Sequence, residues 1–214
     1  MSIEFINVTK TIKKNTVINS VSLTIPSGKI TGLQGINGSG KTMMMRLIAG
    51  LIKATEGEVL INGRVIGKDI DFPESLGMML ENPAFLNSYD GFHNLKLLSD
   101  INGLIDDETI SNTIKRVGLD FAKNKKYKKY SLGMKQRLGI AAAIMESPDL
   151  ILLDEPTNSL DADGVEMVKR IVKEEKRRGA TVVISCHDAE ILNELSDMIY
   201  VIKEGRITDF IEKG

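Results

Sequence analysis

An α/β domain with a largely parallel β-sheet is predicted by this sequence of 214 residues. Short apolar runs bounded by Gly, Pro or Asn alternate with longer segments of helical periodicity, as in strands joined by crossover helices. The first 25 residues differ, because two strand-like runs there are separated only by a polar stretch. The length suits one domain, spanning 1–214, that can bury a sizeable core.

The amino-terminal part is expected to hold a small antiparallel β layer and then the first strand of the parallel sheet. Residues 3–8 and 21–25 have the composition of strands, with the polar stretch 10–16 between them. A further strand is predicted at 29–34, followed by a glycine-rich turn and an apolar helix over 42–49 that Gly50 can end. Residues 59–61 and 76–80 are predicted as additional strands.

The middle of the chain is expected to be helical. Residues 92–117 have helical periodicity, with Asp106 or Asp107 as an N-cap and Gly118 as a C-cap. This pattern predicts a helical subdomain, at about 86–147, inserted into the core that carries the sheet. Its last part is a helix over 131–145.

The remaining residues are expected to return to the sheet. A strand over 150–153, a charged helix over about 162–178 and a strand over 181–185 follow one another. Residues 198–202 and 206–211 are predicted to form a closing hairpin through Glu204 and Gly205.

The charge balance argues against a generally basic surface. Twenty-nine acidic residues face 28 Lys and Arg, for a formal charge of −1, so no nucleic-acid partner is expected. The one local exception is the run 123–129, which holds five lysines and Tyr127. Two interpretations stay open for this run: a patch that pairs with phosphates, or a solvated helix end or loop.

Cysteine usage and hydropathy point to a cytoplasmic protein. The single cysteine, Cys186, cannot form an intrachain disulfide and is expected to be a buried, inert thiol. The first residues lack the basic and then apolar layout of a secretory signal, and no apolar run approaches the ~20 residues that span a bilayer. A role at a membrane would therefore require docking on another chain.

The glycine-rich turn has the pattern G-x-x-x-x-G-K-[ST] between a predicted strand and a predicted helix. Glycines let a backbone wrap around phosphates, so that N–H groups and the positive end of the helix face the anion. Lys41 is expected to meet the β- and γ-phosphates, and the Thr42 hydroxyl to ligate Mg²⁺. We therefore predict a nucleoside triphosphate site formed by Gly35, Ile36, Asn37, Gly38, Ser39, Gly40, Lys41 and Thr42.

A second element ends in two carboxylates. The apolar run 150–153 is typical of a strand buried on both faces, and it delivers Asp154 and Glu155 to the carboxyl edge of the sheet. Asp154 is expected to hold Mg²⁺ through water, and Glu155 to orient or deprotonate the attacking water. An apolar strand followed by Asp-Glu is a weak signal alone, and the phosphate loop strengthens it.

Three further motifs accompany these two in a fixed order. Residues 130–137 precede the Asp154 strand, 158–161 follow Glu155, and 185–188 end the next strand. The set resembles the nucleotide-binding subunit of an ATP-binding cassette (ABC) transporter over essentially the whole chain. The resemblance implies a P-loop NTPase core with a mostly parallel sheet, an N-terminal antiparallel β layer and an inserted helical subdomain.

The resemblance also implies partners and roles. Two such domains, as an ATP-dependent homo- or heterodimer, would place each ATP between the phosphate loop of one and Ser131 and Gly133 of the other. His187 would sense the γ-phosphate and support hydrolysis; without the resemblance, a lone histidine after a strand is more often structural. Asp161 would lie in the loop that communicates between the two ATP sites, serve as a helix N-cap, or do both. A separate membrane-spanning subunit would hold the chain at the inner face of the cell membrane.

Some positions depart from the family pattern. Ile12 stands where the family usually has an aromatic residue that stacks on adenine, and Glu81 occupies the usual glutamine position of a loop, with Asn82, that touches Mg²⁺ and the membrane subunit. Leu132 and Met134 replace a glycine and a glutamine, and Asn158-Ser159 replaces the commoner Ser-Ala. Glu81 together with residues 131–137 resembles the ATPases of bacitracin- and lantibiotic-type peptide exporters.

The sequence and its family resemblance thus favour an ATPase, with ATP and Mg²⁺ as cofactors, that powers export of an antimicrobial peptide or related compound. Two alternatives remain: a soluble ABC-type ATPase acting on ribosomes or DNA, and a nucleotide-binding regulator that does not hydrolyse. Tandem nucleotide domains or a long coiled-coil insertion would favour the first, and this compact sequence has neither. The Asp154-Glu155 pair and His187 argue against the second.

Overall fold

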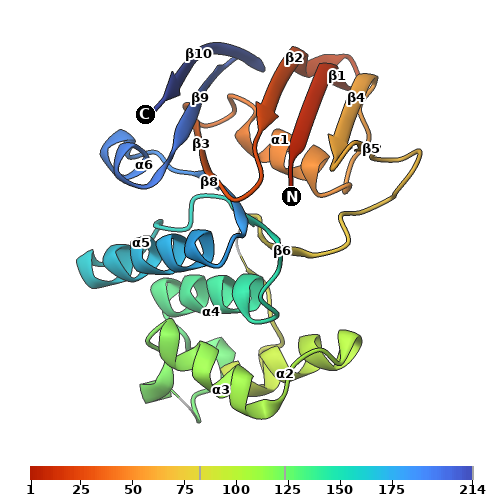
Figure 1. The fold of residues 1–214 in the computed structure, drawn as a ribbon. Helices are drawn as coiled ribbons and strands as arrows, with labels where there is room; N and C mark the ends of the chain where they lie inside the picture. The colour runs from red at the N-terminus through yellow and green to blue at the C-terminus, as the bar shows by residue number, and fades with distance from the viewer. Residues whose placement is uncertain (82, 123, 214) are drawn as a thin grey trace.

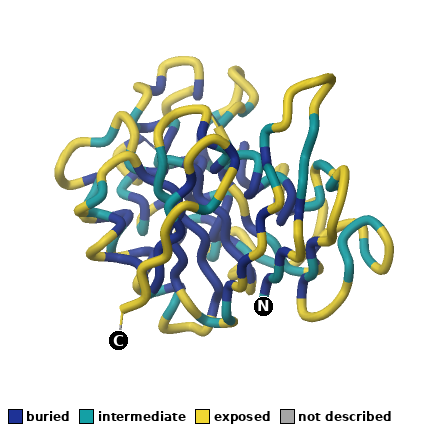
Figure 2. The backbone as a smooth tube through the Cα atoms, turned by 90° about the horizontal axis from the view of Figure 1, so that it is seen from above, coloured by how far each residue is buried: buried dark blue, intermediate teal, exposed yellow. Residues whose placement is uncertain are grey.

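The computed structural model describes residues 1–81, 83–122 and 124–213. A four-stranded antiparallel sheet and part of a six-stranded sheet lie side by side at one end of the molecule, and a group of helices lies at the other end (Figure 1). The buried parts of the backbone gather in the middle, and the exposed parts are mostly loops at the periphery (Figure 2). Asn82, in the Glu81 loop, and Lys123, the first lysine of the basic run, lie outside the described residues.

The antiparallel sheet has the strand order β2-β1-β4-β5. It consists of β1 (Ile3–Ile12), β2 (Asn15–Ile25), β4 (Glu56–Ile61) and the short β5 (Arg64–Val65). The polar stretch 10–16, expected to separate two short strands, instead extends both of them to a tight turn. Thr11 and Thr16 face each other across the hairpin with their hydroxyl oxygens 3.2 Å apart, so polar β-branched side chains continue the pairing.

The second sheet is mostly parallel, as predicted, with the order β10-β9-β3-β8-β7-β6. Its parallel strands are β3 (Ile30–Gln34), β6 (Leu76–Met79), β7 (Leu150–Leu153), β8 (Thr181–Ser185) and β9 (Met198–Lys203). The edge strand β10 (Arg206–Glu212) runs antiparallel to β9. The predicted closing hairpin is confirmed: Glu204 and Gly205 turn the chain with φ of 50° and 73°.

One helix fills the space between the two sheets. α1 (Lys41–Ile48) buries Met44, Met45 and Leu47 among side chains of both sheets, in one continuous apolar cluster. Methionine fills irregular gaps well because its chain is unbranched and flexible. The packing fixes the start of α1 beside the carboxyl ends of the parallel strands.

The other helices lie on the far side of the parallel sheet (Figure 1). α4 (Leu132–Ile144) and α5 (Ala162–Arg177) share an apolar cluster with β7 and β8, and α2 (Gly91–Asn102) and α3 (Asp107–Arg116) pack on α4. The predicted caps are present: the Asp106 side chain accepts from Thr109 N–H, and Gly118 has φ of 69°. The short helix α6 (Ala189–Leu195) and the 3₁₀ turns Asp120–Ala122 and Tyr127–Lys129 complete the chain.

No helix in the described parts of the chain is long and apolar enough to cross a membrane.

Candidate active site

The glycine-rich turn joins β3 to α1 and closes tightly on itself. Gly40 has φ of 119°, a conformation that side-chain-bearing residues rarely adopt. A Cβ on Gly35 would lie only 2.4 Å from the carbonyl oxygen of Ile202, so the loop passes too close to β9 for any side chain there. Ser39 is buried, and its hydroxyl has no hydrogen-bond partner among the described residues.

Lys41 places its charge inside the loop. The residue is only 5% exposed, and its Nζ donates to the carbonyl oxygens of Gly35 at 2.6 Å and Ile36 at 3.2 Å. The same Nζ lies 3.4 Å from Oε1 of Glu155. A buried ammonium needs such partners, because transfer of an isolated charge from water is costly. The loop therefore presents a fixed positive centre.

Asp154 follows β7 and is held by two hydroxyls. Its residue is 6% exposed; Oδ2 accepts from Thr42 Oγ1 at 2.5 Å, and Oδ1 accepts from Ser185 Oγ at 2.5 Å. The Asp154 N–H donates to the carbonyl oxygen of Met79, which ties the end of β7 to the end of β6. The Thr42–Asp154 pair supplies hard oxygen ligands of the kind that Mg²⁺ prefers.

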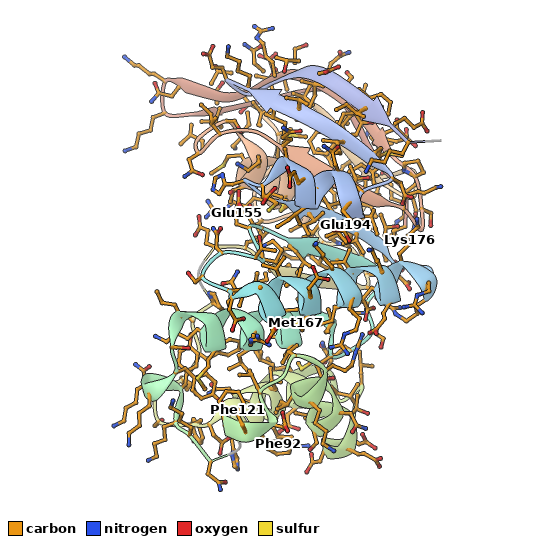
Figure 3. The ribbon with its side chains drawn as sticks, turned by 90° about the vertical axis from the view of Figure 1, so that its left-hand side faces the viewer. Phe92, Phe121, Glu155, Met167, Lys176 and Glu194 are labelled. Carbon is orange, nitrogen blue, oxygen red and sulfur yellow. The ribbon has the colours of Figure 1, made fainter. Side chains whose placement is uncertain are left out.

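Glu155 lies next to two cationic or ionisable side chains. Its backbone has φ of 49°, which turns the chain sharply after the strand. Oε1 lies 3.3 Å from His187 Nε2 as well as beside Lys41, and Oε2 accepts from His187 N–H at 3.0 Å. Oε1 is buried without a hydrogen bond within the described residues, although both these groups are near. The structure thus brings Lys41, Glu155 and His187 together, and Figure 3 shows Glu155 well away from Phe92 and Phe121 at the helical end of the molecule.

Ser131 and Gly133 lie at a different hollow, with a volume of about 620 Å³. Ser131 caps α4 by accepting from Met134 N–H at 3.2 Å, and a Cβ on Gly133 would be 2.9 Å from the carbonyl oxygen of Ser159. Asp161 caps α5, as one of its two interpretations expected, by accepting from Gly164 N–H. Among the described residues, this hollow is lined by none of 35–42, so the two predicted phosphate-binding elements are separate within one chain.

Two other predicted site residues lie outside the cluster around Glu155. The Glu81 side chain is 61% exposed, and its Oε1 lies 2.6 Å from Nη2 of Arg46. Both residues line a groove of about 360 Å³ with Leu51 and Leu98. Ile12 lies at the exposed tip of the β1–β2 hairpin, whose second strand packs against Gly40.

Three residues make contacts at the site that were not predicted from the sequence. Ser185 holds Asp154 and accepts from the N–H of Glu155, Gln136 donates to the carbonyl oxygen of Glu155 at 2.9 Å, and Arg46 pairs with Glu81. Ser185 and Gln136 lie within recognised motifs, and Arg46 follows Thr42 by four residues, on the same face of α1. Spacing of this kind is the only signal the sequence carries for these contacts.

A phosphate loop between a strand and a helix, with a carboxylate pair at the end of a neighbouring parallel strand, defines a P-loop nucleotide hydrolase. A family model described as "ABC transporter" matches residues 18–158. The chain belongs to this family: it is the ATP-binding subunit of an ABC transporter and an ABC-type ATPase.

Relatives of known sequence support the assignment over nearly the whole chain. An uncharacterized ABC transporter ATP-binding protein, YybJ of Bacillus subtilis, is 49% identical over 205 residues, covering 96% of this chain and 94% of the relative. The bacitracin transport ATP-binding protein BcrA of Enterococcus faecalis is 38% identical, covering 97% and 68%. The lantibiotic transport ATP-binding protein SrtF of Streptococcus pyogenes is 36% identical, covering 94% and 86%. The resemblance to the bacitracin and lantibiotic group is thereby confirmed.

Solved structures confirm the fold. The dimeric ABC transporter cassette MJ0796 has a TM-score of 0.90 at 26% identity, covering 99% of each chain. A dimeric post-hydrolysis state of the same cassette, bound to ADP and Pi, has a TM-score of 0.89 at 26% identity, again covering 99% of each chain.

Proposed function

We propose that this chain powers a separate membrane-spanning subunit that exports an antimicrobial peptide or a related compound. The observation that carries the catalytic part is the meeting of Lys41, Glu155 and His187, with Glu155 Oε1 within 3.4 Å of both Lys41 and His187. The bacitracin and lantibiotic relatives support the export of a peptide. The work would take place at the inner face of the cell membrane, where the partner holds the chain.

Lys41 and the N–H groups of 35–42 bind the phosphates and stabilise the charge that develops during transfer to water. Glu155 orients the attacking water or accepts a proton from it. His187 contacts the γ-phosphate and supports hydrolysis. The donor set fits Mg²⁺, since Thr42 and Asp154 already lie together and the buried hydroxyl of Ser39 lacks a partner among described residues. Mg²⁺ bound there would neutralise charge on the β- and γ-phosphates. Glu81 is a further proposed ligand, and Ile12 a proposed apolar contact to adenine.

A second ATPase domain would complete the site. The hollow at Ser131 and Gly133 combines a serine hydroxyl with the amino-terminal end of the 13-residue helix α4, which is suited to bind an anion. It lies apart from Lys41, so we propose that it receives the γ-phosphate of ATP bound to a partner, in a homo- or heterodimer. The dimeric cassette MJ0796 supports this arrangement. Within the single domain 1–214, the helical subdomain at about 86–147 would carry this second element.

The test is to replace Glu155 with Gln and measure phosphate release together with ATP binding. Because the amide cannot accept a proton, we expect hydrolysis to fall by about 100-fold or more, with ATP binding retained. The matched control is Glu204→Gln, which removes the same charge from the exposed turn between β9 and β10 and should leave turnover unchanged. Unchanged turnover in Glu155→Gln would contradict the role of Glu155.

A further inference from the structure

Four exposed lysines lie together in the segment that leads into α4. Lys125, Lys126, Lys128 and Lys129 are exposed, and we call them the lysine edge. The lysine edge flanks the 3₁₀ turn Tyr127–Lys129, a few residues before Ser131. The active site described above uses none of its side chains.

The lysine edge is held in place by two buried tyrosines. The backbone N–H of Tyr127 donates to the carbonyl oxygen of Tyr89 at 2.8 Å. The Tyr127 hydroxyl donates to the carbonyl oxygen of Pro83 at 2.5 Å. Tyr130 accepts from the N–H of Gly91 at 3.1 Å. The alternation of buried tyrosine and exposed lysine therefore keeps the four lysines along a fixed stretch of backbone, where an unstructured solvated loop would scatter them. The Lys125 ammonium also lies 3.8 Å from Met134 Sδ, and the three other lysines are exposed beside it.

The positive charge of this edge is not neutralised locally. Within 1–81, 83–122 and 124–213, none of the four lysines forms an ion pair, whereas charged side chains on α5 and α6 do, as at Lys169 and Glu194. The whole chain carries a formal charge of only −1, so the lysine edge is a local feature. The cations are all lysines, which attract negative charge without the planar, bidentate geometry that arginine uses to recognise a single carboxylate.

Apolar side chains are exposed directly beside the lysines. Leu86 is 53% exposed and Tyr89 is 43% exposed. Their segment is joined to the lysine edge by the Tyr127–Tyr89 hydrogen bond and by a bond of 3.4 Å from Lys128 N–H to the carbonyl oxygen of Asn87. Lysines beside an exposed tyrosine and leucine are the composition that lies at the interface between lipid headgroups and acyl chains.

From this combination we infer that the lysine edge, with Leu86 and Tyr89, contacts a membrane surface that contains anionic lipids. Charge alone would equally fit an acidic protein segment, but the apolar neighbours and the absence of arginine favour a diffuse anionic surface with an apolar layer beneath it. The groove that holds Arg46 and Glu81 continues through Pro83 and Phe85 toward the lysine edge. That this side of the chain faces the membrane rests on the proposed function, in which the membrane subunit docks at the Glu81 loop.

The experiment is flotation of the purified full chain with vesicles of phosphatidylcholine alone or mixed with phosphatidylglycerol. Each lysine near an anionic surface strengthens binding by about fivefold, so changing all four lysines of the edge to Gln should weaken binding to the mixed vesicles by at least tenfold. A matched variant changes four exposed lysines elsewhere to Gln, removes the same charge and should bind like the wild type; these are Lys29, Lys68, Lys203 and Lys213. Raising the salt concentration should weaken wild-type binding.

A second variant, Leu86→Ser with Tyr89→Ser, should weaken binding to the mixed vesicles by at least threefold, which an acidic peptide site would not require. Equal binding to neutral and mixed vesicles, no binding by the wild type, or equal loss in the matched lysine variant would each overturn the inference. Hydrolysis is measured in parallel. If the wild type binds vesicles but does not hydrolyse ATP, the proposed function fails and the membrane contact stands.

Discussion

Asp154 and Glu155 are neighbours with different surroundings, and these surroundings suit the different roles that we propose for them. Asp154 accepts hydrogen bonds from the hydroxyls of Thr42 and Ser185 and lies buried at the end of β7. Glu155, turned by its positive φ, lies beside Lys41 and His187. A carboxylate held by neutral hydroxyls is suited to a metal, and one beside an ammonium and an imidazole is suited to handle a proton.

Arg46 is the ion-pair partner of Glu81. The ion pair at 2.6 Å holds the Glu81 carboxylate in the groove. Replacing Arg46 with Gln removes this partner, so the carboxylate can turn toward Thr42 and Asp154. The test uses Mn²⁺ in place of Mg²⁺, in the presence of ATP. We expect its apparent affinity to rise by about fivefold, because attraction between the freed carboxylate and the metal is worth ~1 kcal/mol near the protein surface.

Electron paramagnetic resonance of unbound Mn²⁺ measures this affinity without relying on turnover. The control is the Glu81→Gln background, in which Arg46→Gln should have no effect because the carboxylate is already absent. If Arg46→Gln changed the Mn²⁺ affinity equally in the wild type and in Glu81→Gln, Arg46 would not act through the Glu81 carboxylate.

Motif spacing predicted the location of single site residues, and it did not predict their contacts. Lys41, Asp154 and Glu155 were chosen because each ends or follows a recognisable element. Ser185 was not assigned a role, because its contact with Asp154 depends on the parallel register that places the end of β8 beside the end of β7. Arg46 was missed because its partner lies 35 residues away on another element.

At the scale of elements, the parallel strands and their helices were predicted well. The apolar runs at 150–153 and 181–185 coincide with β7 and β8, because strands buried on both faces are bounded by abrupt changes in hydropathy. The β1–β2 hairpin was predicted too short, since its outer half is polar and solvent-exposed. Helix α6 was not predicted, because its seven residues are too few to show a helical period in the sequence. Its N-cap is Asp188, whose side chain accepts from the N–H groups of Glu190 and Ile191.

Tyr127 connects the segment before α4 to the loop after β6, and its hydroxyl gives a test of this connection. Burial raises the pKa of Tyr127 above its ordinary value near 10. Folding therefore favours the protonated phenol, so this contribution to stability is present below pH 10 and is lost as the pH rises through the raised pKa. Burial also raises the pKa of Tyr130 and Tyr200, so the wild type should lose stability above pH 10.

Tyr127→Phe removes the hydrogen bond to Pro83 and one ionisable group. We expect the free energy of unfolding in urea to fall by about 1 kcal/mol at pH 8 and to depend less steeply on pH above 10 than in the wild type. The half-exposed Tyr89 provides a control, since Tyr89→Phe should change stability at pH 8 by less than ~0.5 kcal/mol. An unchanged slope in Tyr127→Phe would mean that this phenol does not couple folding to pH.

At the scale of the whole molecule, one chain holds the two elements that we propose form a composite ATP site, and these elements do not meet. The phosphate loop joins β3 to α1, and the Ser131 hollow lies at the start of α4. In Figure 1, α1 lies toward the end of the molecule that holds the antiparallel sheet, and α4 lies toward the helical end. Gln136 links these parts within the chain, because α4 donates through it to the backbone of Glu155. The family resemblance implied a composite site before the structure was known; the separation of its two elements within one chain became visible only in the fold.

The most direct test of the composite site is sedimentation velocity of Glu155→Gln with and without ATP, compared with the same chain carrying Ser131→Asp. Aspartate caps a helix as well as serine does, so α4 should persist, while its charge would repel a γ-phosphate. We predict that ATP doubles the mass of Glu155→Gln and that the double variant binds ATP as a monomer. A dimer that forms equally well with Ser131→Asp would contradict the account, and a chain that stays monomeric with ATP bound would contradict its homodimeric form.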